Sequence, residues 1–507
     1  MGILIATACR EETEVTSWYQ LVRKLRRAAD GIAASALIAA LCATPLVPSR
    51  AATSGPAVSR ASAPPIASLE ELSVESLRAR AYGSRLTVEA RLDVVRTTGG
   101  SKSAAPRTYL TSFRSDGLRE YARLDLPSGP MPEAGYPVVV FLHGWVVLAG
   151  APNLDFRFGK GSNYGAMIDE FTAAGFVVIT PGFRGHGTFD GRAAEGLEYL
   201  ATWDNGTYVS PAFYAIDALN LMEGLGTLAD TDGAQWGREA GPLARIDRRR
   251  INVIGHSQGG DVALIVMAVC GRGSPLKNAA TAGSIWSGTF PSRLTQLATY
   301  HPMETTPQAF LAGDGTWTAT ATGANGSVNP NFVFGYPPDW IGTPHVRNWT
   351  WQRKEWSRKS VAAALKEQLD EMYGTADRLV ADLHGVSYQM QYQEDGRVIV
   401  QHDPKVVEAE ARVGAFQSER FLTQPLSLQH SDRDFYSFPE WNADLCSRIR
   451  QAGGTCSDFI YPGNTHALGV SKARWFSGDQ AVPGFHTALQ RDIVLFRGGD
   501  PRAGSAP

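Results

Sequence analysis

Short apolar runs alternate with amphipathic segments from about Arg107 onwards. The run Tyr136–Leu142 (YPVVVFL) is almost continuously apolar, which is typical of a strand buried on both faces of a parallel sheet. The spacing at Tyr164–Ala174 predicts a helix, and Phe176–Thr180 predicts the next strand. Further elements are expected at Pro211–Leu225 (helix), Arg250–Gly255 (strand), Asp261–Val269 (helix), Ala279–Trp286 (strand), Pro425–Gln429 (strand), Glu440–Ala452 (helix), Ser457–Tyr461 (strand) and Phe485–Phe496 (helix). The alternation predicts an α/β fold, with a mostly parallel sheet and helices on both faces.

The alternation stops in the interval 288–422, which is too long for an ordinary loop and predicts an inserted cap. Within it, Ser360–Tyr373 has helical spacing. A hairpin is expected between Tyr388–Gln393 and Arg397–Gln401, around Asp395-Gly396. The tryptophans of the interval are Trp317, Trp340, Trp349, Trp351 and Trp356. We expect most of them in the core of the cap, with the lining of a substrate pocket as the alternative.

The beginning of the chain differs from the rest. Basic residues at 23–27 precede the apolar run Gly31–Val47, and Pro48–Ala52 follows with small residues. This order predicts a secretory signal peptide over residues 1–52. A membrane anchor is the alternative, although the run lies at the short edge of spanning length. A lipoprotein site at Cys42 is disfavoured because the preceding residue is bulky.

The predicted organisation has four parts after the signal peptide. They are a linker and N-terminal extension at 53–106, a first core part at 107–287, the cap at 288–422 and a second core part at 423–507.

Three cysteines remain if the signal peptide is removed. Cys446 and Cys456 lie ten residues apart, and an exported chain permits disulfides, so we expect these two to pair. Cys270 follows an apolar helix and is expected to be a buried free thiol. The chain has 48 basic and 50 acidic residues, a balance that argues against nucleic acid or an anionic surface as a partner.

The first candidate catalytic motif is Gly255-His256-Ser257-Gln258-Gly259, at the end of a predicted strand. A strand, a sharp turn and a helix around G-x-S-x-G form a nucleophile elbow, in which the two glycines leave room for the turn. The serine hydroxyl is then held above the sheet edge, and the next backbone N–H lies at a helix N-terminus. Ser257 is therefore the candidate nucleophile.

A serine hydroxyl needs a base, and the base needs a carboxylate that orients it. The strand Pro425–Gln429 leads into His430-Ser431-Asp432-Arg433-Asp434, and we choose Asp434 as the acid, with Asp432 as the alternative. His466 lies in a loop just after the last core strand and is the candidate general base.

The strand 136–142 ends in His143-Gly144-Trp145. We assign the oxyanion hole to the backbone N–H groups of Trp145 and Gln258. His143 and His186 are interpreted as structural. No metal-ligand spacing recurs, and Gly182–Gly187 lacks the spacing of a phosphate loop, so no cofactor or metal is expected.

With these residues in place, the chain resembles serine hydrolases of the α/β-hydrolase fold, most of all the prolyl-oligopeptidase-type and dienelactone-hydrolase-type branch. The matching pieces are the strand into His143-Gly144, the loop 184–187 with Asp190-Gly191, Asp217, Asp247, the elbow, and the segments of Asp434 and His466. The resemblance covers roughly 107–290 and 422–497. It implies hydrolysis of an ester or a peptide bond through an acyl-enzyme. The family's usual glycine after the strand-end histidine is Ser431 here, which leaves both Asp432 and Asp434 open.

The sequence thus predicts an exported serine hydrolase that cleaves small carboxylic esters. A serine peptidase of the same fold is the first alternative, although the region before the core is too short for the β-propeller that gates oligopeptidases. A non-catalytic binding protein that uses the Trp-rich cap is the second. Contact with a membrane is expected only through the signal segment, if it is not removed.

Overall fold

The computed structural model describes residues 69–94, 106–144, 163–185, 188–189, 192–196, 209–292, 370, 388–392, 398–431, 437, 439–461, 466 and 483–503. All of them belong to one compact unit, residues 61–507. The predicted signal peptide and the five cap tryptophans lie outside the described residues, as does the predicted helix 360–373 apart from residue 370, which is helical. In the part of the chain that is described, no helix is long and apolar enough to cross a membrane.

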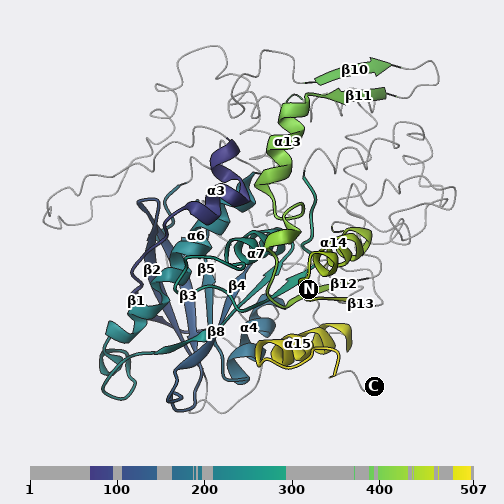
Figure 1. The fold of residues 1–507 in the computed structure, drawn as a ribbon. Coiled ribbons are helices and arrows are strands. Elements are labelled where there is room, and N and C mark those ends of the chain that lie inside the picture. The colour runs from purple at the N-terminus through teal and green to yellow at the C-terminus, as the bar shows by residue number, and fades with distance from the viewer. Residues whose placement is uncertain are drawn as a thin grey trace, which may run out of the picture. The chain divides into compact units, whose positions relative to one another are not determined.

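A nine-stranded sheet forms the centre of the unit, in the order β1-β2-β3-β5-β4-β8-β9-β12-β13 (Figure 1). The strands are β1 (Thr87–Leu92), β2 (Arg107–Ser115), β3 (Leu118–Leu126), β4 (Tyr136–Leu142), β5 (Val177–Pro181), β8 (Ile246–His256), β9 (Ala282–Trp286), β12 (Leu426–Ser431) and β13 (Cys456–Tyr461). From β5 to β13 all neighbours are parallel, whereas β1, β2, β3 and β5 pair antiparallel. The mostly parallel sheet predicted from the sequence is confirmed.

Helices cover both faces of this sheet, as predicted. The helices are α4 (Asn163–Ala173), α6 (Ser210–Gly224), α7 (Gln258–Val269), α14 (Pro439–Gln451) and α15 (Pro483–Phe496). Alternate residues of β4 point to opposite faces: Val138 and Val140 pack with α6 and α7, while Val139 and Phe141 pack with α4 and α15. All seven residues of β4 are buried, which explains why that strand reads as one apolar run.

The antiparallel edge was not anticipated from the sequence. Strands β2 and β3 form a hairpin around Asp116-Gly117, both with positive φ (52° and 83°), as a tight two-residue turn requires. Strand β1 comes from the segment predicted as linker and extension, and it pairs with β2. The Asp-Gly dipeptide was the available signal for this hairpin.

A segment near the end of the predicted cap packs on the N-terminal extension. Helix α13 (Pro404–Val413) packs on η1 (Leu69–Leu72) and α3 (Val74–Ala79). Arg412 makes two hydrogen bonds to the carboxylate of Glu70, at 2.7 and 2.8 Å. Two segments more than 300 residues apart in sequence are thereby joined.

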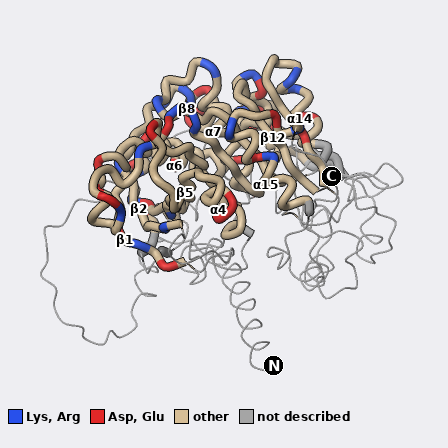
Figure 2. The backbone as a smooth tube through the Cα atoms, turned by 90° about the horizontal axis from the view of Figure 1, so that it is seen from below, with Lys and Arg blue, Asp and Glu red and all other residues tan. Residues whose placement is uncertain are grey.

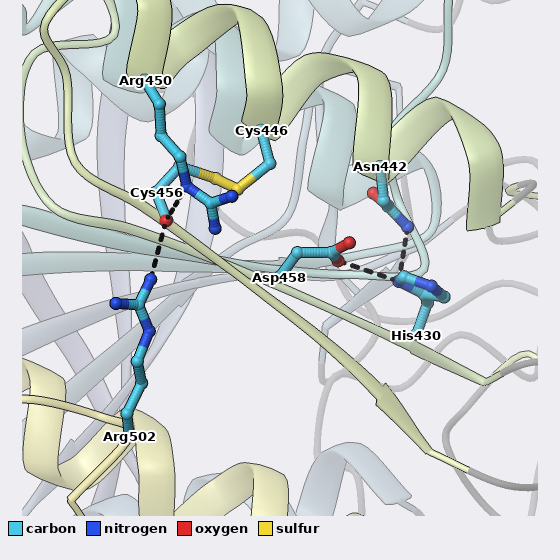
Figure 3. The surroundings of a disulfide bond; sticks show 7 residues. All are labelled: His430, Asn442, Cys446, Arg450, Cys456, Asp458 and Arg502. Carbon is cyan, nitrogen blue, oxygen red and sulfur yellow. Dashed lines mark hydrogen bonds and ion pairs between the residues drawn. A yellow bond between two sulfur atoms is a disulfide. The ribbon is translucent and has the colours of Figure 1, made fainter.

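The predicted hairpin within the cap interval is confirmed, because β10 (Tyr388–Tyr392) pairs antiparallel with β11 (Val398–His402). The predicted disulfide is also present: Cys446 on α14 is bonded to Cys456 at the start of β13 (Figure 3). Cys270 is a buried free thiol, as expected.

Acidic and basic residues are interspersed along the described core (Figure 2). Basic residues gather near β8, where Arg248 and Arg249 are exposed. Asp247 accepts hydrogen bonds from Arg249 and Arg250 and balances part of this charge.

Candidate active site

The nucleophile elbow is formed by a single residue, Ser257. Strand β8 continues to His256, and α7 begins at Gln258, three residues earlier than the sequence indicated. Ser257 therefore has φ 56° and ψ −128°, a backbone conformation that residues with a Cβ rarely adopt. Its N–H donates to the carbonyl oxygen of Trp286 at 2.9 Å, which fixes the turn to the neighbouring strand β9.

The two glycines of the motif are required by backbone contacts. A Cβ on Gly255 would lie 2.0 Å from the carbonyl oxygen of Gly259. A Cβ on Gly259 would lie 2.2 Å from the carbonyl oxygen of Leu142 and 2.3 Å from that of His143. The prediction that only glycine leaves room at these positions is confirmed, and β4, β8 and α7 meet here without intervening side chains.

The turn after β4 lies directly against the elbow. A Cβ on Gly144 would be 3.0 Å from the Cβ of Ser257 and 2.7 Å from the hydroxyl oxygen of Tyr164. Trp145, the predicted oxyanion donor that follows, lies outside the described residues. Gln258, the second predicted donor, is the first residue of α7, where the N–H groups have no acceptor within the helix.

His466 is brought to the elbow from a distant part of the chain. It is buried, and its carbonyl oxygen lies 2.8 Å from Nε2 of His256, the residue before the nucleophile. The rings of His256 and His466 have centroids 5.0 Å apart. The predicted base and the predicted nucleophile thus occupy the same edge of the sheet.

The predicted acids Asp434 and Asp432 both lie outside the described residues. The strand that leads to them, β12, ends at the buried Ser431, between β9 and β13. The carboxyl end of β12 is therefore at the sheet edge that carries Ser257.

A buried polar cluster holds this end of β12 (Figure 3). Nδ1 of His430 lies 2.8 Å from Nδ2 of Asn442 and 3.5 Å from Oδ1 of Asp458. Burial raises the pKa of Asp458 to about 6, although the charge of Arg450 acts in the opposite direction. Sequence reasoning missed this cluster, because its members lie on three different elements.

His143 is structural, as interpreted from the sequence. Its Nδ1–H donates to the carbonyl oxygen of Gly144 at 2.8 Å, and its ring lies 4.7 Å from that of Phe183. Burial lowers the pKa of His143 to about 4, so the ring is neutral near neutral pH. His186 lies outside the described residues.

A small pocket of about 20 Å³ lies along α7, the helix that begins directly after Ser257. Its wall includes Asp261 and Ile265 of α7, Phe290 after β9, and Glu410 and Val413 of α13. Residues of the core helix α7 and of the predicted cap interval 288–422 therefore line one cavity. Within the described ranges, no group of three His, Cys, Asp or Glu residues is arranged to hold a metal ion.

No protein-family model and no curated protein matches the chain. Among solved structures, an acylaminoacyl peptidase from Pyrococcus horikoshii is similar at 15% identity and a TM-score of 0.38, covering 78% of this chain and 41% of the peptidase. An acetyl xylan esterase from a Thermoanaerobacterium species is similar at 13% identity and a TM-score of 0.42, covering 86% of this chain and 96% of the esterase. An esterase from Pseudomonas putida is similar at 12% identity and a TM-score of 0.38, covering 79% and 85%.

The chain thus spans about two fifths of the length of the peptidase. These structures include the peptidases and esterases to which the sequence resemblance pointed. At such identities and TM-scores the likeness does not decide a function. The chain's own strand order and its single-residue elbow are those of the α/β-hydrolase fold, which confirms the predicted fold.

Proposed function

We propose that the chain is an exported serine hydrolase that cleaves carboxylic esters through an acyl-enzyme. One observation carries the proposal: Ser257 is held at φ 56° in a turn with no space for a side chain at Gly255 or Gly259. A strained residue that its surroundings enforce so tightly is typical of a functional position. An ordinary connection from strand to helix has no need of a serine in this conformation.

In the proposed mechanism, His466 removes the proton of the Ser257 hydroxyl as its oxygen attacks the ester carbonyl carbon. Asp434 holds the imidazole in the required tautomer. The negative charge that develops on the carbonyl oxygen is stabilised by the N–H groups of Trp145 and Gln258. Collapse of the intermediate expels the alcohol, which takes the proton from the imidazolium. Water then cleaves the acyl-enzyme by the same steps and restores the serine.

The position of β12 supports an acid from the segment 432–434. Ser431 is the last residue of that strand, and the strand lies next but one to β8 in the sheet. We therefore expect a carboxylate from this segment to reach the edge where His466 lies. Asp434 is the proposed residue and Asp432 the alternative. Activity that survives Asp434→Asn and disappears in Asp432→Asn would reverse the assignment.

The disulfide between Cys446 and Cys456 supports export, because such bonds persist in oxidising compartments. We propose that residues 1–52 act as the signal peptide and that the interval 288–422 forms a cap over the site. The substrate is proposed to be a small ester whose acyl or alcohol group is selected by this cap. A membrane is involved only through the signal segment, if it is retained.

The first experiment compares Ser257→Ala with Ser287→Ala on a nitrophenyl ester. Ser287 is a matched control, because it also has positive φ (48°), is buried, and directly follows the neighbouring strand β9. We expect Ser257→Ala to lower kcat by about 10⁶-fold and Ser287→Ala to leave activity near that of the wild type. A Ser257→Ala protein that retains the wild-type rate would refute the proposal.

The second experiment separates esterase from peptidase activity. The purified protein is assayed on a matched panel of acyl nitrophenyl esters and aminoacyl or peptidyl nitroanilides. We expect kcat/KM to be higher for the esters by a factor larger than their difference in intrinsic reactivity. A preference for the anilides after that correction would assign the chain to the peptidases instead.

A further inference from the structure

A continuous chain of hydrogen bonds runs past the nucleophile through two side chains that have no role in the proposed mechanism. The N–H of Gly144 donates to the hydroxyl oxygen of Tyr164 at 2.8 Å. That oxygen lies 2.7 Å from Nδ1 of His256, and Nε2 of the same ring lies 2.8 Å from the carbonyl oxygen of His466. These hydrogen bonds, which we call the Tyr164–His256 bridge, join the turn after β4, the elbow and the segment of the proposed base His466.

When the imidazole of His256 is neutral, the chemistry of the groups fixes the direction of every hydrogen bond in this series. A carbonyl oxygen can only accept, so Nε2 of His256 must carry the proton that reaches His466. In a neutral imidazole Nδ1 is then an acceptor, so the hydroxyl of Tyr164 donates to it. The tyrosine oxygen remains free to accept from Gly144. Burial raises the pKa of Tyr164, although the hydrogen bond from Gly144 opposes this, so the phenol keeps its proton.

The residues packed around the Tyr164–His256 bridge restrict the movement of its side chains. A Cβ on Gly144 would lie within 3.2 Å of Tyr164, Ser257 and the carbonyl oxygen of His256, so there is no room for a side chain between the backbone and these three groups. The ring of Tyr164 lies 5.3 Å from that of Phe141 on β4 and 5.5 Å from that of His256, in both cases edge to face. The hydroxyl is thereby aimed at its two partners.

We propose that Tyr164 and His256 are positioning residues, which hold the oxyanion turn and the loop of His466 in register with Ser257. This inference rests on the proposed function and adds two residues to it. The turn supplies a proposed oxyanion donor, and the loop supplies the proposed base, yet neither is part of the elbow. A displacement of about 1 Å in such groups can cost about 10²-fold in rate. The Tyr164–His256 bridge links the oxyanion turn and the loop of His466 to the residue before Ser257.

The first test removes only the hydroxyl, with Tyr164→Phe. We expect kcat on a nitrophenyl ester to fall by about 10- to 100-fold with KM nearly unchanged, because substrate binding is not altered. The rate at which a fluorophosphonate labels Ser257 falls in parallel. Tyr109→Phe is the matched control: Tyr109 is buried on β2, and its hydroxyl donates to the carbonyl oxygen of Trp236 at 3.2 Å, three strands away from β4 in the sheet order.

Both tyrosine variants lose one buried hydroxyl, so urea unfolding measures the structural part of the change in each. A fall in kcat for Tyr164→Phe alone, at equal loss of stability, supports positioning. Equal kcat in the two variants and the wild type overturns it.

The second test separates the two hydrogen bonds of His256, one to Tyr164 and one to the carbonyl oxygen of His466. The side-chain amide of His256→Gln reaches far enough to donate to the carbonyl oxygen of His466, whereas His256→Asn can only meet Tyr164. We expect His256→Gln to retain kcat within about 10-fold of the wild type and His256→Asn to lose about 100-fold or more. Equal values for the two variants contradict a bridge that acts by holding the loop.

Ser257→Ala in the same series separates the two proposals. If it is active, the proposed function fails. If it is inactive and Tyr164→Phe has the kcat of the wild type, only the positioning role fails.

Discussion

Gly259→Ala places a methyl group at the point where helix α7 crosses the end of β4. The added carbon would lie 2.2 Å from the carbonyl oxygen of Leu142 and 2.3 Å from that of His143. Ordinary contacts between carbon and a carbonyl oxygen begin at about 3.3 Å, so the helix or the strand must move by about 1 Å. Overpacking costs about 1–3 kcal/mol, and we expect the upper end, because both obstacles are backbone atoms of the central sheet.

The same movement displaces the N-terminus of α7, which carries the proposed oxyanion donor Gln258. We therefore expect Gly259→Ala to lower the free energy of unfolding by about 3 kcal/mol and kcat by about 10²-fold. Urea unfolding and ester hydrolysis measure the two effects.

Gly83→Ala is the control, because a Cβ there meets nothing within 4 Å. Its free energy of unfolding is expected to change by less than about 0.5 kcal/mol. A Gly259→Ala protein with the unfolding midpoint and activity of the wild type would show that the elbow is looser than these contacts imply.

Two further changes test the energetics of the core and of the β12 end. Asp217→Ala removes the fully buried carboxylate partner of Arg184, whose Nη2 lies 2.6 Å from Oδ1, and leaves only Asp116 at 3.1 Å; it should cost about 3 kcal/mol or more. Arg85→Ala, in an exposed pair with Asp230, should cost less than about 1 kcal/mol. Equal losses of stability in urea unfolding would contradict this reasoning. Burial raises the pKa of Asp458 to about 6, above its value in the unfolded chain, so the folded state binds the proton of this carboxyl more tightly. Protonated Asp458 therefore adds to the free energy of unfolding, and this contribution is lost as the pH rises from about 4 through 6. Asp458→Asn should remove that loss, on the order of 2 kcal/mol, when unfolding is measured from pH 4 to 7, and an unchanged slope would mean that this carboxyl does not titrate there.

The sharp turn at Ser257 could be predicted from the sequence because its constraints are local. Gly255 and Gly259 lie within two residues of Ser257, and the contacts that forbid a side chain there arise from one turn. The chain order on this fold then directed attention to His466, which the structure places beside the elbow. The catalytic roles of Ser257, His466 and Gln258 remain predictions, as do those of Asp434 and Trp145.

The bridge of Tyr164 and His256 could not be predicted in this way. His256 occupies a variable position of the motif, and Tyr164 was interpreted only as the start of a helix. Their partners are more than 90 residues away in one bond and 210 in the other. Such contacts depend on how strands and helices pack, and no spacing within the sequence records them.

The sequence by itself determined which segments form the parallel strands of the core, where the chain turns sharply at Ser257, and which two cysteines are close enough to pair. Each of these follows from side chains within about ten residues of one another, whose apolar period or backbone requirement is local. Only the tertiary structure decided that β1 completes the sheet, that α13 packs beside η1 and α3, and that His256 joins two loops. The physical reason is that apolar burial has no direction: it specifies that a face must be covered, while chain connectivity and packing decide which distant segment covers it.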